Sequence, residues 1–165
     1  MRKFAAVLSG LAAGVSLTLV SSGTASATPD DGILANTAGV VTLCATPQGN
    51  STANGTIVTT WSCTGSSLQR WSYDGTYIKN IASGKCLTPS GNHSGTNGTV
   101  LTLWTCTNDT SQRFVIDYSN NHTVIFTQFG GKCITNQGDS MGYGVYLTLW
   151  TCNFSYPESQ EWNVI

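Results

Sequence analysis

Residues 101–106 are Leu-Thr-Leu-Trp-Thr-Cys, and the same six residues recur at positions 147–152. The end of this run appears a third time as Trp-Ser-Cys at residues 61–63. Short alternating runs of this kind are typical of β-strands. A glycine also stands six positions before each tryptophan, at Gly55, Gly98 and Gly144. These coincidences predict that the chain contains three copies of one strand-rich unit.

Two further landmarks support the repeat and fix its period. The first cysteines of the copies are 42 and 47 residues apart, and the second cysteines are 43 and 46 apart, so the period is roughly 45 residues. Each copy then closes with glutamine, any residue and an aromatic residue. These closing motifs are Gln69-Arg70-Trp71, Gln112-Arg113-Phe114 and Gln160-Glu161-Trp162.

The six cysteines allow fifteen disulfide pairings, but a threefold repeat should use the same pairing in every copy. This favours Cys44 with Cys63, Cys86 with Cys106, and Cys133 with Cys152, which close loops of 19, 20 and 19 residues. Each closure should stabilise the fold by about 3 kcal/mol. A zinc site is disfavoured, because the chain has no Cys-x-x-Cys motif and its two histidines, His93 and His122, have no ligand spacing.

About four short strands fit into each period, separated by turns rich in glycine, asparagine and serine. One copy could neither bury its own apolar face nor pair its strand edges. We therefore predict an all-β fold of about twelve strands, in which three copies close around a shared axis into a barrel with capping hairpins.

The composition excludes several other classes of protein. Only 9% of the 165 residues are charged, with seven Lys and Arg against eight Asp and Glu. A nucleic-acid-binding protein would be basic, and amphipathic helices would need many more charged residues for their outer faces. We expect no nucleic-acid partner.

The N-terminus has the features of a secretory signal peptide, residues 1–27. Arg2 and Lys3 precede an apolar run, which ends at the small-residue site Ala25-Ser26-Ala27. A membrane anchor is the alternative, but Ser, Gly and Thr interrupt the run, and no other segment is apolar enough to span a membrane. We therefore expect no membrane partner. We expect a secreted, extracellular chain with a lead-in at residues 28–36 and one domain at 37–165, whose repeats cover about 37–78, 79–124 and 125–165.

Together, the motifs resemble those of ricin B-type lectins. The resemblance rests on Gly-Lys-Cys-Leu at 84–87, Gly-Lys-Cys-Ile at 131–134, the Leu-Trp-Thr-Cys runs and the three closing motifs, and it covers about residues 37–165. It implies a β-trefoil with pseudo-threefold symmetry, the disulfides within the repeats, and up to three shallow sugar sites, one in each repeat.

A sugar site needs an apolar platform for the C–H face of the ring and fixed hydrogen-bonding groups for its hydroxyls. Trp61, Trp104 and Trp150 match the stacking aromatic of the family, with burial in the core as the alternative. The core is the favoured place for Trp71, Phe114 and Trp162. The polar candidates are Thr46, Thr88, Thr135, Gln69, Gln112 and Gln160, although the glutamines could equally satisfy backbone groups.

The chain departs from the family pattern at three positions in each copy. The usual Asp two residues after the first cysteine is Thr46, Thr88 or Thr135, and a hydroxyl lacks the charge and bidentate geometry of a carboxylate. The Asn before the closing Gln is Leu68, Ser111 or Ser159, and the Gln two residues before the tryptophan is Thr59, Thr102 or Thr148. The pockets should be weak, should suit a different glycan, or should have lost sugar binding.

The function predicted from the sequence is carbohydrate binding without catalysis, cofactor or metal, by a monomer whose partner is a polysaccharide or glycan. The alternative is a trefoil that binds a protein, for instance as an inhibitor. An enzyme ranks third: residues 138–140 are Gly-Asp-Ser, but neither histidine offers the serine a recognisable base. Paired carboxylates at a shared repeat position are lacking too.

Overall fold

The computed structural model describes residues 31–119 and 121–165, so the predicted signal peptide lies outside the described part of the chain. In this part the protein has twelve strands, six short 3₁₀-helices and no α-helix. The strands are β1 (Asp31–Asn36), β2 (Leu43–Pro47), β3 (Val58–Ser62), β4 (Arg70–Tyr73), β5 (Ile78–Asn80), β6 (Cys86–Pro89), β7 (Leu101–Trp104), β8 (Phe114–Ser119), β9 (His122–Thr127), β10 (Lys132–Asn136), β11 (Leu147–Thr151) and β12 (Trp162–Val164). The helices are η1 (Gln48–Asn50), η2 (Ser67–Gln69), η3 (Ser90–Asn92), η4 (Thr110–Gln112), η5 (Gln137–Asp139) and η6 (Glu158–Gln160).

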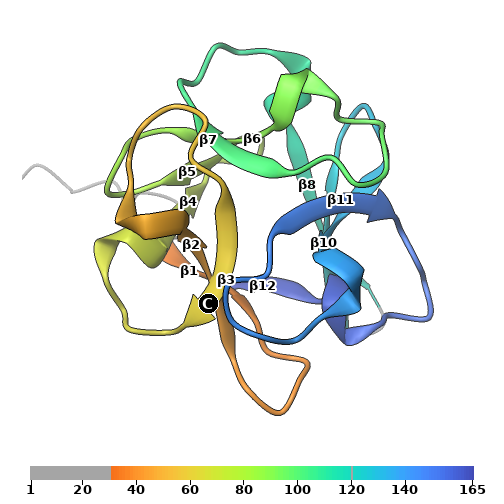
Figure 1. Ribbon diagram of the computed structural model, residues 1–165. Coiled ribbons are helices and arrows are strands. Elements are labelled where there is room, and N and C mark those ends of the chain that lie inside the picture. Colours follow the sequence, from red (N-terminus) through yellow and green to blue (C-terminus); the bar gives the residue numbers. More distant parts are fainter. Residues whose placement is uncertain (1–30, 120) are drawn as a thin grey trace, which may run out of the picture.

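The strands form three lobes around one axis, as Figure 1 shows. Six strands make the barrel: β1 pairs with β4 and β12, β4 with β5, and β8 with β9, all antiparallel. A backbone hydrogen bond from Phe114 to Thr76 joins the β5 and β8 segments, and β9 contacts β12. The other six strands form the hairpins β2–β3, β6–β7 and β10–β11. The all-β barrel with capping hairpins predicted from the repeat is confirmed, and so is the β-trefoil that the resemblance implies.

The hairpins are joined to one another as well as to the barrel. Single antiparallel bridges link Ile57 to Thr102, Val100 to Thr148 and Thr59 to Tyr146, so that each repeat touches both of the others. Such contacts pair strand edges that one repeat alone would leave open.

Every strand contributes one or two apolar residues to the core, and the aromatic residues of the closing motifs are the contributions of β4, β8 and β12. Trp71, Phe114 and Trp162 are at most 1% exposed, which confirms their predicted place in the core. Trp71 is also tied down, since its Nε1 donates to the carbonyl of Ala45 at 3.1 Å.

The sequence-based boundary at residue 37 lies after a strand of the barrel. Strand β1 pairs with β2, β4 and β12, and it buries Leu34 and Ala35 completely. None of the repeat landmarks falls in residues 31–36, so the sequence pattern misses this strand, whose place depends on its partners.

Candidate functional site

The three hairpins each carry two threonines and a tryptophan on one face. In the second repeat Thr88 lies directly opposite Thr102, and Trp104 follows two residues later, which places it on the same face of its strand. The pairs Thr46–Thr59 and Thr135–Thr148 have the same register, with Trp61 and Trp150 beside them. Each set lines a pocket, of about 270, 340 and 200 Å³ for repeats one, two and three.

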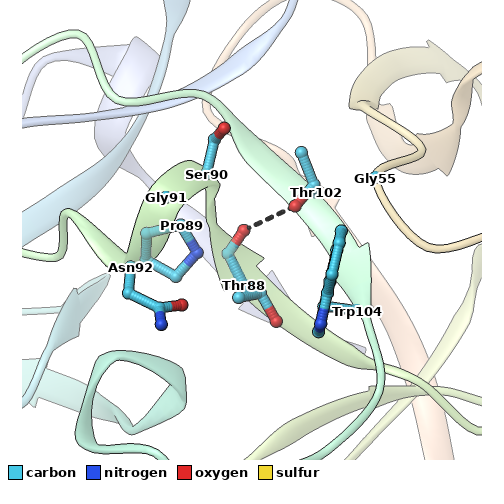
Figure 2. Close-up of a pocket in the computed structure, with 8 residues that line it drawn as sticks. All are labelled: Gly55, Thr88, Pro89, Ser90, Gly91, Asn92, Thr102 and Trp104. Carbon is cyan, nitrogen blue, oxygen red and sulfur yellow. Dashed lines mark hydrogen bonds between the residues drawn. The ribbon is translucent and has the colours of Figure 1, made fainter.

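The threonine hydroxyls on the pocket floor have their hydrogens directed into the protein. Thr88 Oγ1 donates to the carbonyl of Cys86 at 2.9 Å. Thr102 Oγ1 donates to the carbonyl of Thr88 at 3.0 Å (Figure 2). The other repeats have the same bonds, at 3.0 to 3.2 Å. A hydroxyl has one donor and two acceptor positions. The floor therefore offers lone pairs to a ligand that brings its own donors.

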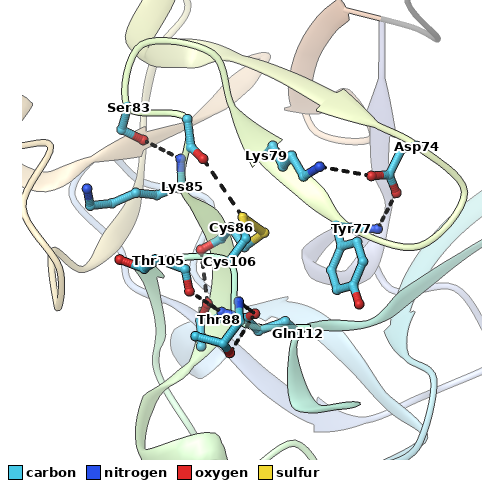
Figure 3. The surroundings of a disulfide bond; sticks show 12 residues. Asp74, Tyr77, Lys79, Ser83, Lys85, Cys86, Thr88, Thr105, Cys106 and Gln112 are labelled. Carbon is cyan, nitrogen blue, oxygen red and sulfur yellow. Dashed lines mark hydrogen bonds and ion pairs between the residues drawn. A yellow bond between two sulfur atoms is a disulfide. The ribbon is translucent and has the colours of Figure 1, made fainter. Parts of the chain in front are cut away.

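The closing glutamines lie behind this floor, where they are almost fully buried. Gln112 Nε2 donates to Thr88 Oγ1 at 2.9 Å and to the carbonyl of Thr105 at 3.0 Å, while its Oε1 accepts from the amide of Thr107 at 2.9 Å. Figure 3 shows this network beside the Cys86–Cys106 disulfide. Gln69 and Gln160 make the corresponding bonds to Thr46 and Thr135. Both amide hydrogens of each glutamine are thus committed to protein acceptors.

The three candidate platform tryptophans are about half exposed: 50% for Trp61, 45% for Trp104 and 49% for Trp150. Each is backed by a glycine of another repeat. A Cβ on Gly55 would lie 3.7 Å from the ring of Trp104, and those on Gly98 and Gly144 would lie 3.6 and 3.8 Å from Trp150 and Trp61. These glycines have φ of 75° to 82°, a conformation that L side chains rarely adopt.

The far wall of each pocket is a turn that was not predicted from the sequence to form part of the site. In the second repeat it is η3, where Gly91 and Asn92 both have positive φ, at 64° and 61°. Helices η1 and η5 match it, with Asn50 and Asp139 in place of Asn92. The available signal was a glycine five residues after the first cysteine of every copy, followed by Asn or Asp. Among the residues lining the three pockets, only Asp139 is charged.

The comparisons with known proteins agree with this geometry. The model of the ricin-type β-trefoil lectin domain matches residues 24–114 and 75–165. The chain belongs to the ricin-type β-trefoil lectin family. No curated protein matches its sequence.

Solved structures with the same fold include the designed threefold-symmetric protein ThreeFoil, at 19% identity and a TM-score of 0.68, with 74% of this chain and 90% of ThreeFoil covered. An exo-β-1,3-galactanase from Clostridium thermocellum shows 22% identity and a TM-score of 0.71, with 82% of this chain covered. The hemolytic lectin CEL-III shows 23% identity and a TM-score of 0.67, with 84% of this chain covered. This chain matches only 30% of the length of the galactanase and 31% of the length of CEL-III. At these identities, the likeness concerns the fold.

All three predicted disulfides of the lectin domain are present: Cys44–Cys63, Cys86–Cys106 and Cys133–Cys152. In each repeat the first cysteine lies directly opposite the candidate platform tryptophan, as Cys86 does opposite Trp104. The bond to the second cysteine, two residues beyond that tryptophan, therefore clamps the end of the hairpin that carries it.

The Gly-Asp-Ser run lies in the turn of the third pocket. Asp139 Oδ1 accepts a hydrogen bond from Ser159 at 2.6 Å, and the two histidines are engaged elsewhere. His122 Nδ1 lies 2.6 Å from Glu161 Oε1, and the His93 ring folds over Gly91 in the second repeat.

Across residues 31–119 and 121–165, no group of three or more His, Cys, Asp or Glu side chains is placed to hold a metal ion. No helix of the described chain is long and apolar enough to cross a membrane.

Proposed function

We propose that this lectin domain is secreted and binds glycans without catalysis, by holding sugar rings in its three shallow pockets. The observation that carries the proposal is the threefold recurrence of a half-exposed tryptophan beside two inward-bonded threonines. The ring offers an apolar surface to a pyranose C–H face, and the threonine lone pairs accept hydrogen bonds from its hydroxyls. Secretion is supported by the signal-like residues 1–27 and by the three disulfides.

Trp61, Trp104 and Trp150 are the proposed platforms, and Thr46, Thr88 and Thr135 the proposed hydrogen-bond acceptors. The structure supports an indirect role for Gln69, Gln112 and Gln160, since each orients the pocket threonine of its repeat from behind. Each pocket is shallow and has few fixed polar groups, so a single site should bind weakly. Three sites on one molecule would then favour a polymer, to which they can bind together.

The test is retention of the oxidised chain on insoluble xylan, β-glucan and galactan, and on a glycan array. We expect retention that free oligosaccharide abolishes, and that falls stepwise as Trp61, Trp104 and Trp150 are replaced by alanine. Tyr118→Ala is the matched control, since this aromatic side chain is 70% exposed and lines none of the three pockets. Failure of the folded wild-type chain to bind any glycan would overturn the proposal in favour of a protein partner.

A further inference from the structure

The first pocket differs from the other two in the loop that reaches it from the neighbouring repeat. This loop brings Gly144 behind Trp61, and the residue before that glycine is Tyr143. The ring centroids of Tyr143 and Trp61 are 5.8 Å apart, with the planes inclined at 41°. The equivalent residues beside the second and third pockets are Asn54 and Asn97, so only the first pocket has a second ring at this position.

The two asparagines tie their loops to the strand end beyond the platform tryptophan. Asn54 Oδ1 accepts from the amide of Thr105 at 3.1 Å, and Asn97 Oδ1 accepts from Thr151 Oγ1 at 3.2 Å. Both side chains are therefore used to attach the loop. Tyr143 does not make these bonds, and its loop keeps only the backbone bonds that all three loops share, here between Gly144 and Thr60 and between Thr60 and Val145.

The side chain of Thr60 adds a further attachment to these backbone bonds. It is completely buried, where the other two repeats have Leu103 and Leu149. Its Oγ1 donates to the carbonyl of Gly142 at 2.7 Å and accepts from the amide of Val145 at 3.0 Å. The hydroxyl thus holds the loop on both sides of Tyr143. The two departures from the repeat, Thr60 and Tyr143, act together to place an aromatic ring beside Trp61.

The tyrosine extends the surface of Trp61 without covering it. Tyr143 is 54% exposed, and Trp61 is no less exposed than the tryptophans of the other two pockets. Two inclined rings at this separation can contact neighbouring sugar units, because the centroid distance is close to the length of one pyranose residue. The residues that line this pocket carry no charge.

We propose that Tyr143 is a specificity-determining residue, which with Trp61 forms a two-ring platform for two adjacent units of a neutral oligosaccharide. The second and third pockets each hold one unit. This inference rests on the proposed function and adds to it a length preference at one site. Fixing the ring through Thr60 before the ligand arrives reduces the entropy lost on binding.

The test isolates the first site in the full chain with Trp104→Ala and Trp150→Ala, and measures affinity by calorimetry. The probes are one-, two- and three-unit oligosaccharides prepared from xylan, β-glucan and galactan. We expect the affinity to rise about fivefold from one unit to two, the gain of one further aromatic contact. Tyr143→Asn, which restores the residue type of the other repeats, should remove this gain, so that one-unit and two-unit probes bind with equal affinity, whereas Tyr143→Phe should keep it.

Thr60→Val tests the positioning role, and Thr60→Ser is its rescue. The valine variant should lose most of the two-unit gain, and the serine variant should recover it. If oligosaccharides bind and Trp61→Ala abolishes binding, but Tyr143→Asn leaves the length dependence intact, the two-ring platform is wrong and the proposed function stands. If the wild-type chain binds none of the oligosaccharides or their parent polysaccharides, both are wrong.

Discussion

Replacing Gln112 with alanine distinguishes a glutamine that supports the pocket from one that contacts the sugar. The side chain makes four hydrogen bonds of 2.9 to 3.2 Å: one each to Thr88 and Thr105, and two to the amide and hydroxyl of Thr107. At about 1 kcal/mol for each net bond, the variant should lose about 4 kcal/mol of unfolding free energy. A loss of this size should lower the Tm by roughly 15 °C.

Urea denaturation followed by tryptophan fluorescence measures the loss, and Gln128→Ala is the matched control. Gln128 is exposed, so its variant should stay within about 0.5 kcal/mol of the wild type. Binding is measured in a chain that also carries Trp61→Ala and Trp150→Ala, so that only the second site remains. A Gln112 variant that kept wild-type stability but lost binding would refute the supporting role and make the glutamine a direct sugar contact.

Three further predictions follow from other parts of the structure. Replacing Cys86 and Cys106 together by serine should cost about 3 kcal/mol of unfolding free energy, because the unfolded chain loses a 20-residue closure; urea denaturation measures it, and an unchanged midpoint would contradict it. Asp139→Asn, in a chain whose third site is isolated by Trp61→Ala and Trp104→Ala, should weaken binding at that site about fivefold in calorimetry, because a charged acceptor becomes neutral. The control Asn92→Ala, at the equivalent position of the second repeat, should leave the affinity of the third site unchanged. Burial raises the pKa of Asp74, but hydrogen bonds from Tyr77, Lys79 and Thr76 outweigh it, so the pKa lies below its ordinary value. The resulting stability is present above the unfolded-state pKa and is lost as pH falls through the folded-state pKa. When Tm is measured as a function of pH, the Tm of Asp74→Asn should therefore fall less steeply toward acid pH than that of the wild type.

The parts of the fold that could be predicted from sequence are those fixed by offsets within one repeat. The cysteine spacing predicted the disulfides, and the two kinds of aromatic position separated the buried Trp71 from the half-exposed Trp61. Contacts between repeats could not be found this way. Gly55 lies six residues before Trp61, yet it backs Trp104 of the next repeat. A fixed offset along the chain does not reveal which copy lies alongside in space.

The pocket threonines show why a departure from the family pattern need not abolish an acceptor site. The family places a carboxylate where this chain has Thr88, and a free hydroxyl would be an ambiguous substitute, able to donate as well as accept. Here the Cys86 carbonyl takes its hydrogen and Gln112 occupies one lone pair, so one acceptor position remains for a ligand. The substitution therefore keeps the direction of the hydrogen bond and removes its charge. A sugar held by such a floor gains less binding energy from its hydroxyls, so the aromatic surface should decide affinity, and the pocket with the additional ring of Tyr143 should discriminate most between ligands.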